Sequence, residues 1–211
     1  MKYAAGFIQR GEVVGIPTDT FYGLSVDPFN LSAIEGVFRA KGRPETKALP
    51  ILVNSVEQAL SMVREMPDSF LELANQFWPG PLTLVVEATH RLPLKVTGNT
   101  GRVALRWANS HVATALIDAV GGPITGTSAN LSGHPSCSNA GQIVEQLGNR
   151  LPLILDAGDT GGSLAAMIVV PGSKFLIVPR SARSASSCGV SPASSACSES
   201  SVISGLSIAP L

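Results

Sequence analysis

The sequence predicts a single α/β domain over residues 1–180, a sheet with helical cover. Three observations lead to this prediction. Short apolar runs of strand length alternate with segments whose apolar residues recur at helical spacing, which is typical of α/β proteins. The 211 residues, 45% of them hydrophobic, suffice for one ordinary core. The composition then changes, because 12 of the 31 residues at 181–211 are serine, and we expect that tail to be disordered.

The individual elements follow from their patterns, in chain order. Strands are expected where short apolar runs meet turn residues, at 12–16, 49–53, 82–86, 103–107, 124–127, 153–156, 167–170 and 175–178. Helices are expected where apolar residues recur with the helical period, at 31–38, 56–63, 70–77, 111–120 and 140–147. Asn30 precedes the first of these helices, and its side chain suits the N-cap position.

Charge and cysteine content exclude several classes of protein. The formal net charge is zero, with 15 basic and 15 acidic residues, which excludes a globally basic nucleic-acid coat. The three cysteines are too few for a disulfide framework and form no CxxC pair. We find no apolar run long enough for a membrane span and no targeting peptide. We therefore expect a cytoplasmic protein, with the mitochondrion as the alternative.

Basic side chains gather in two clusters. They are Arg39, Lys41, Arg43 and Lys47, with one acid between them, and Arg91, Lys95, Arg102 and Arg106, with none. Local clusters inside a neutral protein favour an anion pocket, and solvated surface faces are the alternative. Arg102 and Arg106 share one face of an expected strand. Two guanidiniums there would suit a bidentate clamp for a phosphate or a carboxylate.

Two polar segments complete the candidate site. TGTSANLSG at 125–133 follows an apolar strand, and its small residues would let backbone N–H groups and hydroxyls approach a phosphate. An ordinary Ser/Gly turn is the alternative. PTDTFYGL at 17–24 ends the first strand, where α/β proteins often bind ligands. Its alternative is a capped turn in which Asp19 bonds its own backbone.

Metal and hydrolase motifs are missing from the sequence. The three histidines lack metal-ligand spacing, and neither a Walker A motif nor a GxSxG elbow occurs. Asp156 and Asp159 could bind Mg²⁺, although their spacing is more typical of a turn. FWPGP at 77–81 predicts a helix end whose aromatic side chains close the core. We expect no protein-bound metal.

Five segments, in this order, resemble the Sua5/YrdC/YwlC family of threonylcarbamoyl-AMP synthases. They are PTDTFYGL at 17–24, KGRPETKALPILV at 41–53, FWPGPLTLVV at 77–86, RVALRW at 102–107 and TSANLSG at 127–133. The similarity runs from about Gly11 to Asp156 and is greater to the free-standing synthase than to the longer two-domain Sua5. It implies a YrdC-like fold, a twisted open mixed sheet with flanking helices around a basic concave cavity.

The resemblance also implies a reaction. Enzymes of this family join L-threonine, bicarbonate and ATP, with Mg²⁺ on the ATP, into L-threonylcarbamoyladenylate and release pyrophosphate, as nucleotidyltransferases. A tRNA threonylcarbamoyl-transferase complex would then use the product to form N6-threonylcarbamoyladenosine at position 37 of ANN-decoding tRNAs. A YrdC-like module that binds double-stranded RNA or tRNA is the alternative function.

The resemblance assigns roles to individual residues. Thr20 and Arg106 would bind threonine. The residues implied for ATP binding are Arg43, Lys47, Arg102, Gly126, Ser128, Asn130, Ser136 and Arg180. Lys41 would join the phosphate contacts, and Lys41, Arg43 and Ser128 would act in catalysis. Residues 163–170, SLAAMIVV, depart from the Ser-Thr-Val-Val-Asp pattern implied there, so a catalytically impaired homologue is a further alternative.

Overall fold

The computed structural model describes residues 1–43, 47–162 and 167–169. In chain order the elements are α1 (Lys2–Gln9), β1 (Val14–Ile16), β2 (Gly23–Ser25), α2 (Leu31–Lys41), β3 (Ile51–Leu52), α3 (Val56–Leu60), α4 (Asp68–Phe77), β4 (Leu82–Glu87), β5 (Arg102–Arg106), α5 (His111–Val120), β6 (Ile124–Thr125), β7 (Thr127–Ser128), α6 (Ala140–Leu147), the 3₁₀ helix η1 (Gly148–Arg150), β8 (Leu153–Ile154) and β9 (Met167–Val169). The α/β class predicted from the sequence is confirmed.

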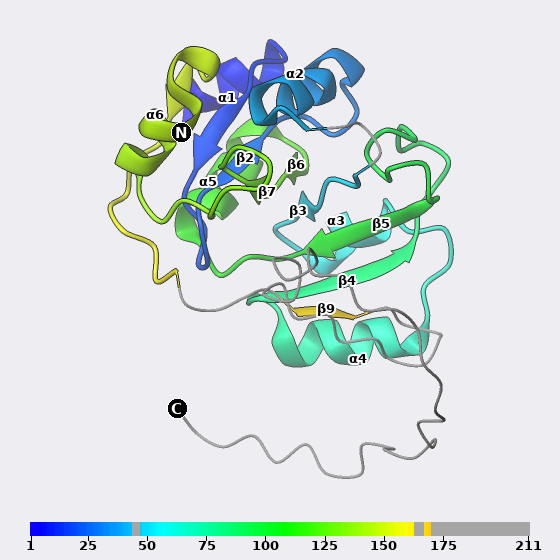
Figure 1. The fold of residues 1–211 in the computed structure, drawn as a ribbon. Coiled ribbons are helices and arrows are strands. Elements are labelled where there is room, and N and C mark those ends of the chain that lie inside the picture. The colour runs from blue at the N-terminus through cyan, green and yellow to red at the C-terminus, as the bar shows by residue number, and fades with distance from the viewer. Residues whose placement is uncertain (44–46, 163–166, 170–211) are drawn as a thin grey trace, which may run out of the picture.

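The strands form two mixed sheets, which lie one above the other in the view of Figure 1. The four-stranded sheet has the order β7-β2-β1-β8, and its β1–β8 pair is parallel. The five-stranded sheet has the order β6-β3-β5-β4-β9, with parallel β3–β5 and β4–β9 pairs. The sheets meet at Gly126, which separates β6 from β7 and so divides the single strand predicted at 124–127.

Four of the helices have a polar side chain at the N-cap position. The side chains of Asn30, Ser55, Ser110 and Asn139 each accept a hydrogen bond from a backbone N–H in the first turn of α2, α3, α5 and α6, respectively. These acceptors satisfy N–H groups that have no partner within the helix. The predicted N-cap at Asn30 is therefore confirmed, with its Oδ1 3.2 Å from the Ala33 nitrogen.

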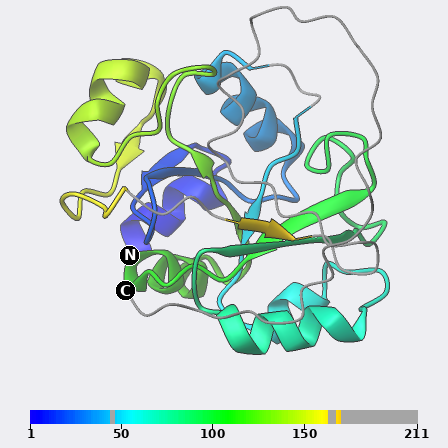
Figure 2. The same cartoon turned by 60° about the horizontal axis from the view of Figure 1, so that its bottom comes forward.

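The helices cover the sheets through two apolar clusters. Helices α1 and α5 pack against each other and share one cluster with β1. The larger cluster joins α2 to both sheets. Helix α4 lies along the five-stranded sheet beside β4, as Figures 1 and 2 show. At the end of α4, Trp78 packs edge to face against Phe70, with 5.5 Å between the ring centroids, which confirms the core-closing role predicted for the aromatic residues.

Three elements were missing from the sequence-based prediction: α1, β2 and the 3₁₀ helix η1. Helix α1 has only eight residues and contains a glycine, and β2 reads Gly-Leu-Ser, which has low strand propensity. The predicted strand at 175–178, Arg180 and the tail at 181–211 lie outside the described residues. Among the helices of the described part of the chain, none has the length and hydropathy needed to cross a bilayer.

Candidate active site

Arg106, the last residue of β5, is a buried cation with three partners. Only 6% of it is exposed. Its Nε donates to the carbonyl of Gly80 (3.0 Å), Nη1 to Oγ1 of Thr20 (3.1 Å) and Nη2 to Oδ1 of Asp19 (2.6 Å). Burial lowers the pKa of Arg106, and the carboxylate of Asp19 opposes that shift. The guanidinium is therefore fixed against the loop between β1 and β2.

That loop is braced by its own hydroxyl groups. Oγ1 of Thr18 donates to the Phe21 carbonyl (2.6 Å) and accepts from the Thr20 backbone nitrogen (3.2 Å). The hydroxyls of Thr18 and Thr20 lie 3.1 Å apart. Because Thr18 holds the turn, the side chains of Asp19 and Thr20 are available to Arg106. Asp19 thus pairs across the two sheets and does not cap its own turn, which the sequence left open.

Gly80 supplies a contact that the sequence analysis missed. Its N–H donates to the Trp107 carbonyl (2.8 Å), while its own carbonyl accepts from Arg106. A Cβ atom at this position would lie 2.4 Å from the carbonyl oxygen of Phe77. Only glycine fits there without displacing backbone. The signal was the glycine three residues after the end of α4, which we interpreted only as part of a helix stop.

Lys41, at the end of α2, joins the KGRP segment to the TSANLSG segment. The lysine is 3% exposed. Its Nζ donates to the Ser128 carbonyl, to the Asn130 carbonyl (2.9 Å) and to Oδ1 of Asn130 (3.2 Å). In return, the Lys41 carbonyl accepts from the N–H of Ser132 (2.9 Å). Two segments far apart in the sequence therefore form one polar unit.

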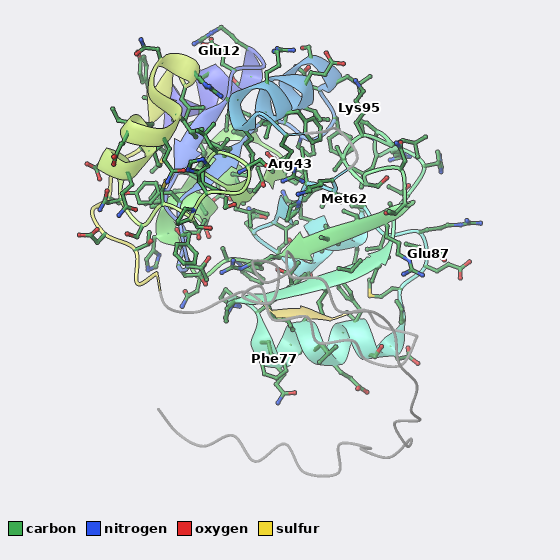
Figure 3. The ribbon with its side chains drawn as sticks, in the orientation of Figure 1. Glu12, Arg43, Met62, Phe77, Glu87 and Lys95 are labelled. Carbon is green, nitrogen blue, oxygen red and sulfur yellow. The ribbon has the colours of Figure 1, made fainter. Side chains whose placement is uncertain are left out.

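Arg43 also contributes hydrogen bonds to this polar unit. Its Nη1 donates to Oγ1 of Thr127 (3.1 Å), and its Nη2 donates to the carbonyls of Lys47 and Ala48, both at 2.8 Å. Figure 3 shows Arg43 inside the ribbon near β6 and β7. The KGRP arginine is thus directed at protein carbonyls and a hydroxyl of the TSANLSG segment.

The other predicted site residues occupy different surroundings. Asn130 is buried, and its Nδ2 donates to the carbonyls of Leu131 (2.8 Å) and His134 (2.6 Å). Ser128, Ser136 and Gly126 are half-buried, whereas Lys47 and Arg102 are exposed. Arg102 and Arg106 stand at opposite ends of β5, and Arg106 is bound elsewhere, so the structure does not form the clamp that we predicted from this pair.

Tyr22 is a further residue of the site that sequence reasoning missed. It is fully buried, and its hydroxyl donates to the Gly158 carbonyl (2.8 Å) and accepts from the Ala157 nitrogen (3.1 Å). Burial raises the pKa of Tyr22. The N–H of Gly162 also reaches the Thr20 carbonyl (3.1 Å). The segment that follows β8 is thus tied to the β1–β2 loop.

The acidic pair considered for Mg²⁺ forms a turn. Oδ1 of Asp156 accepts from the N–H of Gly158 (2.9 Å), and Asp159 accepts from Asn139 (2.9 Å). No group of three or more His, Cys, Asp or Glu side chains in residues 1–43, 47–162 and 167–169 is arranged to hold a metal ion.

Fold and site together are those of an α/β protein whose two mixed sheets both contribute to a buried polar centre. The chain belongs to the Sua5/YciO/YrdC family, because the family model Sua5_yciO_yrdC, described as telomere recombination, matches residues 6–181. The resemblance drawn from the five sequence segments is thereby confirmed.

Individual relatives agree with this assignment. The chain is 39% identical over 160 residues to the threonylcarbamoyl-AMP synthase of Pyrococcus abyssi, covering 76% of this chain and 47% of that protein. It is 39% identical over 166 residues to the putative threonylcarbamoyl-AMP synthase of Mycobacterium tuberculosis (strain CDC 1551), covering 79% and 76%, respectively. The chain thus spans about half the length of the Pyrococcus relative.

Solved structures show the same fold. The crystal structure of P. abyssi Sua5 complexed with L-threonine superimposes with a TM-score of 0.78 at 37% identity, over 80% of this chain and 50% of that one. The crystal structure of E. coli YciO gives a TM-score of 0.76 at 21% identity, over 84% and 87%. At that identity, YciO supports the fold alone.

Proposed function

We propose that this chain is a threonylcarbamoyl-AMP synthase, a nucleotidyltransferase that makes L-threonylcarbamoyladenylate and pyrophosphate from L-threonine, bicarbonate and ATP. Two relatives of that name are 39% and 36% identical to it. The observation that carries the proposal is the buried guanidinium of Arg106 beside the Thr20 hydroxyl, within a fold shared with a Sua5 whose crystal contains L-threonine.

Arg106 and Thr20 would bind the threonine. A guanidinium has five N–H donors, and the contacts to Gly80, Thr20 and Asp19 occupy one direction on each of its nitrogen atoms. Its two terminal nitrogens therefore each carry a second N–H, which suits the two oxygens of a carboxylate. Thr20, a residue that is 4% exposed, would supply a further polar contact through its hydroxyl.

The nucleotide would lie against the polar unit formed by the KGRP and TSANLSG segments. Lys47 and Arg102, both exposed, and Arg43 would attract the triphosphate. The residues proposed to line the nucleotide are Gly126, Ser128, Asn130 and Ser136. Mg²⁺ would arrive bound to the triphosphate, as part of the substrate.

The chemistry needs neutralisation of charge more than a strong base. Threonine nitrogen attacks bicarbonate, which forms an N–C bond and gives a carbamate and water. A carbamate oxygen then attacks the α-phosphorus of ATP, and the bond to the β-phosphate oxygen breaks as pyrophosphate leaves. Because three anions are brought together, fixed cations and N–H or O–H donors would lower the barrier. Arg43 and Ser128 are the proposed donors to the reacting phosphoryl group.

Burial of two of the site cations disfavours the RNA-binding alternative. Lys41 and Arg106 are almost completely buried, whereas contact with an RNA backbone requires cations at the surface. The alternative of a catalytically impaired homologue depends on residues 163–170, most of which lie outside the described part. We further propose that the adenylate is passed to a tRNA threonylcarbamoyl-transferase complex for modification of adenosine 37.

Pyrophosphate release tests the proposal. The purified chain should release pyrophosphate only when ATP, Mg²⁺, bicarbonate and L-threonine are all present. In Arg106→Lys, which replaces a planar fork with a point charge, we expect the KM for threonine to rise about tenfold or more. Arg64 is an exposed arginine, and Arg64→Lys is the matched control, which should leave the KM for threonine unchanged. Pyrophosphate release that does not depend on threonine would contradict the proposal.

A further inference from the structure

The ammonium group of Lys41 is enclosed by protein oxygens. An ammonium group has three N–H donors. Three acceptors surround this one, the carbonyls of Ser128 and Asn130 and the Oδ1 of Asn130. With 3% of the residue exposed, the charge lies against two backbone carbonyls and the side-chain amide oxygen of Asn130. A direct contact with ATP phosphates, which the resemblance implies, would require at least one of these bonds to break.

The loop depends on this cation for its shape. Two carbonyl oxygens and an amide oxygen that converge on one point repel one another unless a positive charge lies between them. The rest of the loop is held by weaker neutral bonds, such as that from the Ala129 N–H to the Tyr22 carbonyl (2.8 Å). Asn130 uses its Nδ2 to brace the chain as far as His134 (2.6 Å). Removal of the ammonium would therefore leave these three oxygens without their common donor and loosen this part of the chain.

We infer that Lys41 is a positioning residue, whose ammonium group shapes the Ser128–Asn130 loop for the nucleotide and does not itself contact the phosphates. The inference rests on the proposed function in assigning the loop to ATP. The carbonyl oxygens of Ser128 and Asn130 accept from Lys41, so the half-buried Ser128 side chain would be the group that contacts the ligand. The role resembles that of a bound cation that organises a loop from within.

NMR of the wild-type protein gives the first test. The Nζ signal of Lys41, assigned through its side-chain carbons, should be visible and slow to exchange with water in the ligand-free protein. Addition of Mg²⁺-ATP should leave its chemical shift nearly unchanged. A signal that appears only with ATP, or that ATP displaces strongly, would overturn the inference. No variant has to fold for this measurement.

Hydrogen exchange gives the second test. In Lys41→Met, which keeps the length of the side chain and removes the donors, the amide of Ala129 should exchange about tenfold faster or more without any nucleotide. Arg39→Met is the matched control, since Arg39 lies on the same helix turn and its side chain is 72% exposed; it should leave that amide unchanged. Wild-type exchange in Lys41→Met, together with weakened ATP binding, would favour a direct phosphate contact. If the wild-type protein binds no ATP, the proposed function fails, while both tests still decide the role of Lys41 in the loop.

Discussion

The ion pair between Asp19 and Arg106 shows how one residue can stabilise the charge of another. Both side chains are largely buried, 16% and 7% exposed, and their charged atoms lie 2.6 Å apart. Removing one partner of such a pair costs more than the pair contributes, because the remaining charge is left in a medium that solvates it poorly. Asp19 therefore affects the binding of any ligand of Arg106 indirectly, because it stabilises the charged guanidinium.

Asp19→Asn tests this dependence, since it keeps the shape and the acceptor oxygen but removes the charge. We expect the free energy of unfolding to fall by about 2 kcal/mol, because Arg106 loses its counter-ion. Urea unfolding measures this. Asp118→Asn, at an exposed aspartate that accepts from Asn54, is the control and should cost less than about 0.5 kcal/mol. Equal losses in the two variants would show that the charge of Asp19 has no special part in stability.

At the scale of elements, local patterns predicted most of the fold. Helices α5 and α6 begin and end at the predicted residues, and α2 begins behind its predicted cap. The division of the sheet was not predictable in this way. Ile124, Thr125 and Thr127 have the β-branched side chains of one strand. The close approach of Leu52 to Gly126 marks where the chain passes from one sheet to the other.

The site was predictable in its members but not in their contacts. The basic clusters and the TSANLSG segment drew attention to Lys41, Arg43 and Arg106. The local excess of basic residues suggested that these side chains bind an anionic ligand. The structure shows them bound to carbonyls, two hydroxyls and one carboxylate of the protein. Such partners arise from tertiary contacts across the sheets, which local patterns do not contain.

Gly126→Ala tests the junction between the sheets. A Cβ atom at Gly126 would lie 2.5 Å from Cγ of Leu52, which is itself buried. We expect a loss of about 2 kcal/mol in the free energy of unfolding, measured by urea denaturation. Gly122→Ala, where an added Cβ meets nothing within 4 Å, is the control and should be neutral within about 0.5 kcal/mol. A neutral Gly126→Ala would mean that the Leu52 side chain can move aside for the added methyl group at little cost.

At the scale of the whole molecule, the polar centre holds the two sheets together. Arg106 belongs to the five-stranded sheet, whereas Asp19 and Thr20 come from a loop of the four-stranded sheet. Tyr22 then links that loop to the segment after β8. Any change that loosens one sheet should therefore disturb the candidate site before the core.

Alkaline pH should reveal the contribution of the buried thiol to global stability. Burial raises the pKa of Cys137 above its ordinary value of 9.0, although Lys41 opposes the shift. The folded protein thus retains a proton that the unfolded chain gives up. This contribution to stability is complete below about pH 9 and is lost as the pH rises through the folded pKa.

The free energy of unfolding should consequently fall more steeply above about pH 9 in the wild-type protein than in Cys137→Ala. Urea unfolding at several pH values measures how the free energy of unfolding of each protein depends on pH. Ionisable groups that both proteins contain contribute equally to the two slopes, so the difference between the slopes reports on Cys137. Parallel slopes would show that Cys137 ionises in the native state as readily as in the unfolded chain.

The pairing of β1 with β8 affects the order in which the sheet can form during synthesis. Val14 lies opposite Leu153 in the parallel pair, so one edge of β1 has no strand beside it until almost the whole domain has left the ribosome. The growing chain must carry this open edge throughout synthesis, and open edges invite pairing with other chains. The four-stranded sheet can close only after translation has passed Ile154, so its assembly is a late event.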